Sequence, residues 1–102
     1  DGQKDEKEIT RIFLDSQFNM DPYECAIEVE YIFYLTWPKS ITAEHKKYNN
    51  FSRFKPDLDN LIKFYNDASA KILWSDDSLI ASIFAQKIYD KNPRTVLKIR
   101  EI

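Results

Sequence analysis

Four aspartates in the middle of the chain have the residue type and the spacing that metal-dependent chemistry needs. Asp57 and Asp59 stand two positions apart directly after Pro56, and Asp76 and Asp77 form a pair further along. Mg²⁺ prefers oxygen ligands and usually takes one or two carboxylates together with water and a substrate phosphate. Three carboxylates that converge repel one another unless a cation lies between them. We therefore predict a divalent-metal site that draws on both pairs.

The first pair belongs to the start of a predicted helix. Pro56 disfavours a helical conformation for the residue before it, and Asp57 can cap a helix that begins at Leu58 or Asp59. Lys63 follows Asp59 by four positions, so these two side chains share a helix face. Apolar residues recur three and four positions apart, which predicts that the opposite face enters the core. They are Leu58, Leu61, Ile62, Tyr65, Ala68 and Ile72.

The second pair is predicted to lie at a turn between this helix and a strand, because an apolar run over residues 79–83 follows it. We expect the sheet to bring this turn beside the start of the helix. Each feature also has an ordinary structural explanation: Asp57 as an N-cap, Asp76 and Asp77 as a solvated turn, and Lys63 as half of a surface ion pair. The combination favours the metal site.

The order and spacing of these residues resemble the RusA family of Holliday-junction resolvases. The motif begins with Lys-Pro-Asp-Leu-Asp-Asn-Leu-Ile-Lys over residues 55–63, and Asp67, Asp-Asp-Ser at 76–78 and Lys-Ile-Tyr at 87–89 follow. The resemblance extends from about residue 27 to the C-terminus. It implies that Asp57, Asp59 and Asp77 bind Mg²⁺, with Asp76 adjacent and Mn²⁺ as an alternative ion. It also implies that Lys63 is catalytic, either by stabilising the transition state or by positioning water.

The resemblance implies a Mg-dependent endodeoxyribonuclease that resolves four-way DNA junctions by paired phosphodiester hydrolysis during recombination and repair. It further implies a homodimer with one site per subunit. Nothing in the sequence calls for a nucleotide cofactor. Two alternatives stay open: a nuclease for other branched DNA, and a nucleic-acid-binding module without enzymatic activity.

Three departures from the family pattern concern the surroundings of the proposed ligands. Family members begin with a strand ahead of the first helix, whereas this chain opens in a charged helical stretch, so we expect it to lack that strand. A glycine that is common between the central helix and the acidic turn is missing. Leu79 stands where glutamine is usual.

Composition excludes several other classes of protein. With 102 residues the chain forms a single domain over residues 1–102. One histidine and one cysteine are too few for an all-protein zinc site and argue against a histidine-based triad, and a single glycine excludes a phosphate-binding P-loop. The lone Cys25 and the absence of an 18-residue apolar segment favour a cytoplasmic protein outside the membrane.

The charge distribution suggests where DNA binds. The net charge is −2, but residues 37–55 and 78–102 are net positive and flank an acidic centre. Residues 37–54 show little periodicity and mix basic with aromatic side chains, which suit phosphates and unpaired bases. The alternative is a surface loop whose aromatic residues dock on the core. The predicted DNA-binding residues are Lys39, Lys46, Lys47, Arg53 and Lys55.

The remaining elements define the predicted fold. Residues 1–18 form a helix lying on the sheet, and residues 25–36 alternate as a strand with one apolar face. The other face of this strand turns from acidic to apolar along its length, which suggests cover by a helix or by a second subunit. Residues 79–89 and 95–102 are predicted to pair as an antiparallel hairpin. The order helix, strand, loop, helix, strand, strand indicates an α+β fold, with helices packed on a small mixed sheet.

Overall fold

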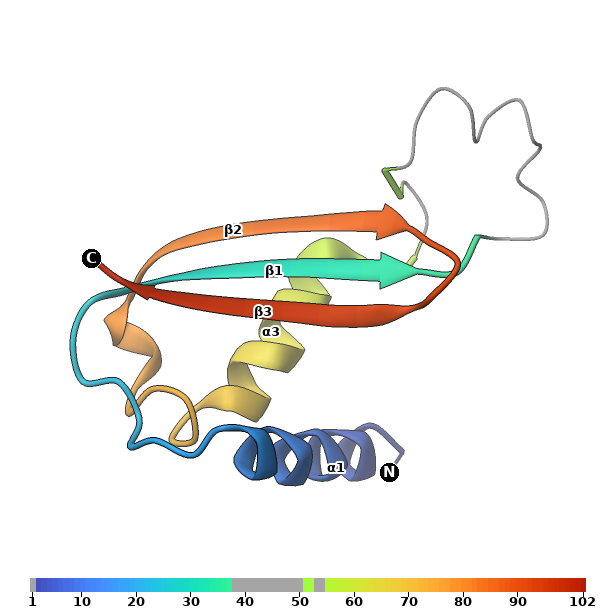
Figure 1. The fold of residues 1–102 in the computed structure, drawn as a ribbon. Coiled ribbons are helices and arrows are strands. Elements are labelled where there is room, and N and C mark those ends of the chain that lie inside the picture. Colours follow the sequence, from blue (N-terminus) through green and yellow to red (C-terminus); the bar gives the residue numbers. More distant parts are fainter. Residues whose placement is uncertain (1, 38–50, 53–54) are drawn as a thin grey trace.

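The described part of the chain forms the predicted α+β arrangement, with two α-helices and a mixed sheet. A computed structural model describes residues 2–37, 51–52 and 55–102. Along the chain, α1 (Gly2–Gln17) precedes β1 (Ile27–Leu35), α3 (Leu58–Ser69), the short 3₁₀ helix η1 (Asp77–Leu79), β2 (Ile80–Tyr89) and β3 (Arg94–Glu101). Both α-helices lie on one side of the three strands, as Figure 1 shows. The opposite face of the sheet is not covered by any described element.

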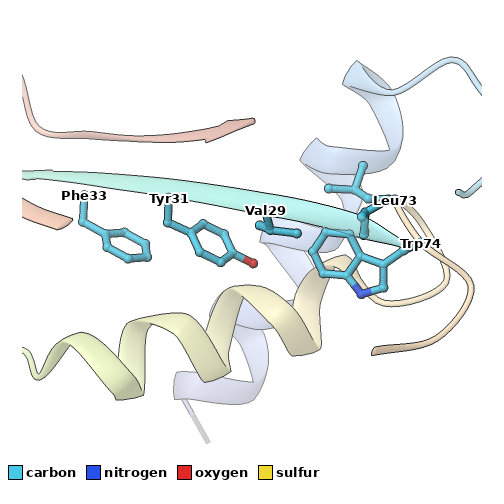
Figure 2. Close-up of a cluster of buried hydrophobic side chains, with 6 residues drawn as sticks. Val29, Tyr31, Phe33, Leu73 and Trp74 are labelled. Atoms are coloured by element: carbon cyan, nitrogen blue, oxygen red, sulfur yellow. The ribbon is translucent and has the colours of Figure 1, made fainter. Parts of the chain in front are cut away.

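The core forms on the apolar face that the alternation in β1 predicted. Buried and half-buried residues alternate along this strand, as expected for a strand with one face turned to the core. Val29, Tyr31 and Phe33 project from β1 toward α3, and Leu73 and Trp74 close the end of the cluster (Figure 2). Tyr31 and Phe33 also stack, with ring centroids 5.3 Å apart. This row of large side chains fixes which side of the sheet the helices cover.

The strand order is β2-β1-β3, so the predicted hairpin between the last two strands is wrong. β1 lies between them and pairs in parallel with β2 and antiparallel with β3. The short connection between β2 and β3 passes over the end of β1, where the N–H of Asp90 donates to the carbonyl of Leu35 at 2.8 Å. Two strand spacings are only about 10 Å, a distance that four residues can span. The central position gives the most apolar strand hydrogen-bonding partners on both sides.

α3 forms where its apolar periodicity predicted, and it links the parallel strands β1 and β2. Leu58, Leu61, Ile62 and Tyr65 pack against the core cluster, and Ala68 is fully buried. A parallel strand pair requires such a crossover connection, which a helix usually provides. Consequently α3 runs back along the sheet, and its two ends lie at opposite ends of the strands.

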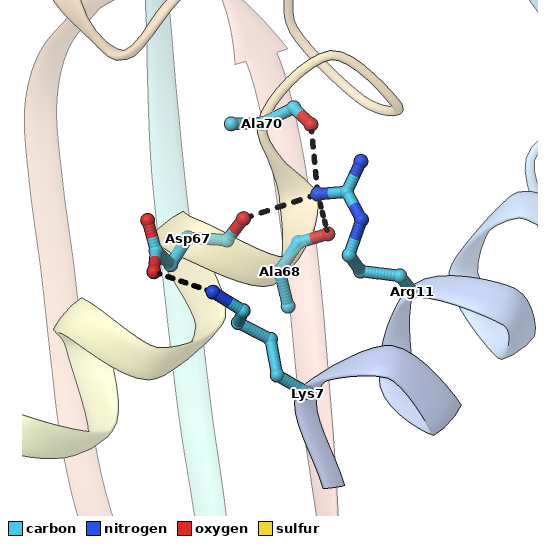
Figure 3. Close-up of polar contacts among 5 residues, drawn as sticks. All are labelled: Lys7, Arg11, Asp67, Ala68 and Ala70. Atoms are coloured by element: carbon cyan, nitrogen blue, oxygen red, sulfur yellow. Dashed lines mark hydrogen bonds and ion pairs between the residues drawn. The ribbon is translucent and has the colours of Figure 1, made fainter. Parts of the chain in front are cut away.

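α1 packs mainly beside α3, which corrects the prediction of a helix lying on the sheet. One guanidinium nitrogen of Arg11 donates to the carbonyls of Asp67, Ala68 and Ala70 at 3.1–3.2 Å, as Figure 3 shows. Nζ of Lys7 lies 3.2 Å from a carboxylate oxygen of Asp67. Because the carbonyls at a helix C-terminus lack partners within the helix, Arg11 satisfies groups that α3 leaves open.

The apolar side chains of α1 differ in their burial. Leu14 packs against the core, but Ile9, Ile12 and Phe13 are each more than 60% exposed. The helix was therefore predicted correctly as an element, and only part of its apolar side reaches the core.

Candidate functional site

Asp57 occupies the N-cap position of α3, but its carboxylate does not cap the helix. Its carbonyl accepts a hydrogen bond from the N–H of Leu61 at 3.1 Å, and no side-chain cap hydrogen bond forms. Instead, Oδ2 lies 3.4 Å from Nζ of Lys55, and the side chain is 49% exposed. Because a capping carboxylate would be committed to backbone N–H groups, this one is more available to a ligand.

Asp59 and Lys63 lie on the first turns of α3, and both are exposed. Residues four apart on a helix are neighbours, with about 5–6 Å between their Cβ atoms. Asp59 is one turn or less from Asp57 along the chain, so both carboxylates belong to the same end of the helix. Two exposed carboxylates next to exposed lysines fit the way Mg²⁺ is usually held, by one or two carboxylates with a phosphate completing its ligands.

Lys87 is a neighbour of this site to which sequence reasoning assigned no role, although it belongs to the motif. Its Nζ donates to the carbonyl of Pro56 at 2.9 Å. Lys87 lies opposite Phe33 in the sheet register, so it stands on the helix-covered face of β2. The sequence did contain a signal for such a role, because a lysine on the inner face of a predicted strand needs a polar partner. The contact holds the start of α3 at the C-terminal end of β2 and adds a positive charge beside Asp57.

Asp76 and Asp77 have different partners at the opposite end of α3. Asp76 caps η1 by accepting from the N–H of Ser78 at 2.8 Å, and this hydrogen bonding lowers the pKa of Asp76 below its usual value. Oδ1 of Asp77 accepts from the indole N–H of the fully buried Trp74 at 2.7 Å. The indole fixes one oxygen of Asp77 and so orients its carboxylate. Asp76 thus caps a helix, whereas Asp77 is held by a buried indole and keeps its second carboxylate oxygen outside that contact.

The negative charge of Asp77 affects a buried tyrosine, Tyr31 on β1. Burial, followed by the negative charge of Asp77, raises the pKa of Tyr31 above its usual value. The Tyr31 hydroxyl donates to Oδ1 of Asn66 on α3 at 2.7 Å. The phenol therefore stays protonated at neutral pH, and this hydrogen bond joins β1 to α3 near the acidic turn.

The two acidic pairs lie at opposite ends of α3 within one chain. The 12 residues of α3 span about 18 Å at 1.5 Å per residue. The sheet register agrees, because the first residue of β2, just after Asp77, pairs with Ile27, whereas Lys87 beside the start of α3 pairs with Phe33. Figure 1 shows the same separation along the sheet.

The expectation that the acidic turn lies beside the start of the helix is therefore wrong for a single chain. Among the described residues, no group of three or more Asp, Glu, His or Cys side chains could hold a metal ion. The physical reason is the parallel connection, which requires the helix to return along the full length of the sheet before β2 begins. Asp57 and Asp59 stay together, and Asp77 is separated from them.

Most of the predicted DNA-binding residues, namely Lys39, Lys46, Lys47 and Arg53, lie outside the described residues. Lys55 is described, and its side chain is 86% exposed. Trp37 stacks on Tyr89 with ring centroids 4.4 Å apart, and Phe51 forms a β-bridge with Ile88. The described residues on both sides of the basic segment thus lie at the C-terminal end of β2, the end that also holds the start of α3.

The uncovered face of the sheet offers less free positive charge than its sequence suggests. Arg100 on β3 makes two hydrogen bonds to one carboxylate oxygen of Glu28 on β1, at 2.8 and 3.1 Å. Lys98 on β3 lies 3.6 Å from a carboxylate oxygen of Glu30. These cations are therefore paired with carboxylates on the neighbouring strand.

The fold and the site define a small α+β domain with a candidate divalent-metal site at the start of a central helix. Comparison with known proteins identifies the family. The model of the family described as "Endodeoxyribonuclease RusA" matches residues 3–100. The chain belongs to the RusA endodeoxyribonuclease family.

A curated relative extends beyond this chain. Over 75 residues the chain is 32% identical to the uncharacterized protein YqaN of Bacillus subtilis (strain 168), and the match covers 68% of this chain and 53% of YqaN. The chain therefore spans about half the length of this relative. No solved structure matches the chain significantly.

None of the helices among the described residues is both long and apolar enough to cross a membrane.

Proposed function

We propose that the chain is a divalent-metal-dependent endodeoxyribonuclease that resolves four-way DNA junctions by paired phosphodiester hydrolysis in recombination and repair. Membership of the RusA family supports the nuclease class. The observation that carries the proposal is the pair of exposed carboxylates at the start of α3, where the side chain of Asp57 is not used as a cap. A cytoplasmic location suits this activity.

Asp57 and Asp59 would hold Mg²⁺, or Mn²⁺ in its place. The bound ion would polarise a phosphoryl oxygen and lower the pKa of a bound water. The exposed Lys55 and Lys63 provide positive charge for the DNA backbone and for charge that develops in the transition state. Lys87 holds the residue before Asp57 in place through its contact with the Pro56 carbonyl.

Asp77 is proposed as a further ligand that comes from a second copy of the chain. Within one chain it follows the far end of α3, a helix about 18 Å long, and so lies beyond the reach of an ion held at the start of that helix. A homodimer that places the turn of one copy beside the α3 start of the other would bring Asp57, Asp59 and Asp77 together twice. Two such sites also match the two cuts that junction resolution requires.

The first test is cleavage of a synthetic four-way junction beside a linear duplex with the same arms, each with Mg²⁺ and with EDTA. We expect paired nicks confined to the junction and abolished by EDTA. Cleavage in EDTA would contradict the metal-dependent mechanism. Equal cutting of flaps or forks in a substrate panel would instead favour a nuclease for other branched DNA.

The second candidate function is a nucleic-acid-binding module without catalysis. The separation of the two acidic pairs within one chain favours it if the protein acts as a monomer. Junction binding without cutting, at protein concentrations where the chain is shown to be dimeric, would support this alternative over the nuclease.

A further inference from the structure

Lys87 interrupts the apolar pattern of the strand on which it lies. On the helix-covered face of β2, Ile83 and Ala85 lie opposite buried residues of β1, and Lys87 continues the same row opposite the buried Phe33. Lys87 is also the only charged residue in the sequence of β2. Charged side chains are rarely placed in an inward row unless they are paired. A lysine at this position therefore indicates a task that packing alone does not require.

Two contacts of Lys87 tie separate parts of the chain to the C-terminal end of β2. Its Nζ donates to the carbonyl of Pro56 at 2.9 Å, and its own carbonyl accepts from the N–H of Ser52 at 3.0 Å. Lys55 lies between these two attachment points in the sequence, and its Nζ is 3.4 Å from the carboxylate of Asp57. One residue of the sheet thus holds the chain immediately before the candidate metal site.

The two peptide groups that flank Asp57 are both held by hydrogen bonds. The carbonyl of Pro56, in the peptide before Asp57, accepts from Lys87, and the carbonyl of Asp57 itself accepts from the N–H of Leu61 at 3.1 Å. Because these two planar groups set the backbone torsions of Asp57, its Cβ has a fixed position relative to α3. The side-chain torsions then decide where the carboxylate lies, and no cap hydrogen bond restricts them.

Metal sites depend on residues that bind no metal but fix the ligands that do. Replacing such a residue typically weakens metal affinity or activity roughly 10- to 100-fold. The ammonium group of a lysine has three donors and no acceptor, so Lys87 is not itself a ligand. Its contact with the Pro56 carbonyl gives it a route to Asp57 through the backbone.

We propose that Lys87 is a positioning residue of the candidate metal site, which fixes the backbone of Asp57 so that its carboxylate meets a divalent cation together with Asp59. The inference rests on the proposed function, because it concerns the ion that Asp57 and Asp59 would hold. Lys87 affects how tightly the ion is held and takes no part in the bond-breaking step. It differs in this from Lys63, which is exposed on α3 beside Asp59.

The test compares the Mn²⁺ affinity of full-length wild-type, Lys87→Met and Lys87→Arg proteins without DNA, by electron paramagnetic resonance. Methionine keeps an apolar stem and removes the donor, whereas arginine keeps both a donor and the charge. We expect Lys87→Met to bind Mn²⁺ roughly 10- to 100-fold more weakly, and Lys87→Arg to bind it nearly as well as the wild type. Unchanged affinity in Lys87→Met would overturn the assignment, and a wild type that binds no Mn²⁺ would overturn the site itself.

Lys98→Met is the matched control. Lys98 is also a strand lysine, and its Nζ lies 3.6 Å from a carboxylate oxygen of Glu30 on the uncovered face. The change removes the same charge from the same sheet without affecting the contact with Pro56. Equal weakening of Mn²⁺ binding in Lys98→Met and Lys87→Met would show that net charge is responsible, and the positioning role would be wrong.

Thermal unfolding of the metal-free variants separates positioning from a purely structural role. A role confined to stability would lower the Tm of Lys87→Met and leave its Mn²⁺ affinity at the wild-type level well below that Tm. If Lys87→Met does not fold, Lys87→Gln takes its place, because its side chain is one bond shorter and falls short of the Pro56 carbonyl. We expect the same weakening of Mn²⁺ binding there, and a wild-type affinity in a folded Lys87→Gln protein would count against the proposal.

The Mg²⁺ dependence of junction cleavage separates this inference from the proposed function. In Lys87→Met we expect the rate at saturating Mg²⁺ to approach that of the wild type, with the half-saturating concentration raised by the same factor as the loss of affinity. A lower rate that no Mg²⁺ concentration restores would place Lys87 in the bond-breaking step and contradict a positioning role. Weaker Mn²⁺ binding in Lys87→Met, combined with a wild type that cuts no junction, would leave the positioning role intact and count against the proposed function alone.

Discussion

Asp57 and Asp76 both precede a helix, yet only Asp76 uses its carboxylate as a cap. Asp76 accepts from the N–H of Ser78, while the carboxylate of Asp57 lies 3.4 Å from Nζ of the exposed Lys55. The sequence supports a capping role at both positions equally well, since aspartate is a preferred N-cap residue. The difference arises from the local backbone, and it makes Asp57 the better ligand candidate of the two.

Replacing Asp57 or Asp59 with asparagine should abolish cleavage while leaving the fold intact. Both side chains are exposed on the first turn or cap of α3, so the change removes a charge without disturbing the core. We expect junction cleavage to fall by at least about 100-fold, measured with Mg²⁺ at saturating protein.

Asp67→Asn is the matched control for these two variants. It removes a carboxylate from the same helix, about 12 Å along α3 from Asp59, and this carboxylate pairs with Lys7. Its cleavage rate should stay near that of the wild type. A wild-type rate in Asp57→Asn would refute the assignment of Asp57 as a ligand.

The pairing of Glu28 with Arg100 should make stability depend on acid pH. Hydrogen bonding to Arg100, the largest cause, lowers the pKa of Glu28 below its ordinary value of 4.5. A carboxyl with a lowered folded-state pKa stabilises the fold above its unfolded-state pKa, and this stabilisation is lost as pH falls through the folded-state pKa. Arg100→Gln should therefore melt below the wild type at pH 7, and the difference in Tm should shrink below about pH 4. A difference in Tm that is constant from pH 7 to pH 3 would contradict this role.

At the scale of elements, Arg11 should contribute more to stability than the neighbouring ion pair. Its guanidinium satisfies three carbonyls at the end of α3, whereas the Lys7–Asp67 pair is largely exposed. Arg11→Met should lower the free energy of unfolding by about 1–3 kcal/mol, and Lys7→Met by less than about 1 kcal/mol. Urea denaturation measures both. Equal losses would show that charge near α3, and not the carbonyl contacts, is responsible.

The elements themselves were largely predictable, because their local patterns are strong. Alternation over residues 25–36 identified β1 and its inward face, and the spacing from Leu58 to Ala68 identified α3. Strand order was not predictable in the same way. A short connection after Tyr89 suggests a hairpin between the last two strands. In the structure β1 lies between them instead, and this order depends on tertiary packing that local patterns do not encode.

The sequence predicted where Asp57 and Asp59 lie, but not where Asp77 lies relative to them. Spacing correctly placed Asp57 and Asp59 together at a helix start, because that is a local property of the chain. The distance from Asp57 to Asp77 depends on whether the intervening helix joins parallel or antiparallel strands. The sequence carried no direct signal for that direction, and the parallel connection separates the two pairs.

At the scale of the whole molecule, the separation of the acidic pairs is what the proposed two-fold dimer would explain. One chain provides two carboxylates at one end of α3 and a further carboxylate at the other end. A single two-fold contact between two copies would complete two such sites at once.

Mixing two inactive variants should distinguish sites within one chain from sites shared between two. Asp57→Asn and Asp77→Asn homodimers should each be inactive. In a mixed dimer, one shared site combines the intact Asp77 of one copy with the intact Asp57 of the other, and the second site carries both substitutions. After subunit exchange, we expect nicking of one strand of the junction without the paired cut, from about a quarter of the sites present in the wild type. If each site were built within a single chain, both sites of every mixed dimer would carry a substitution, and mixing would restore no cleavage.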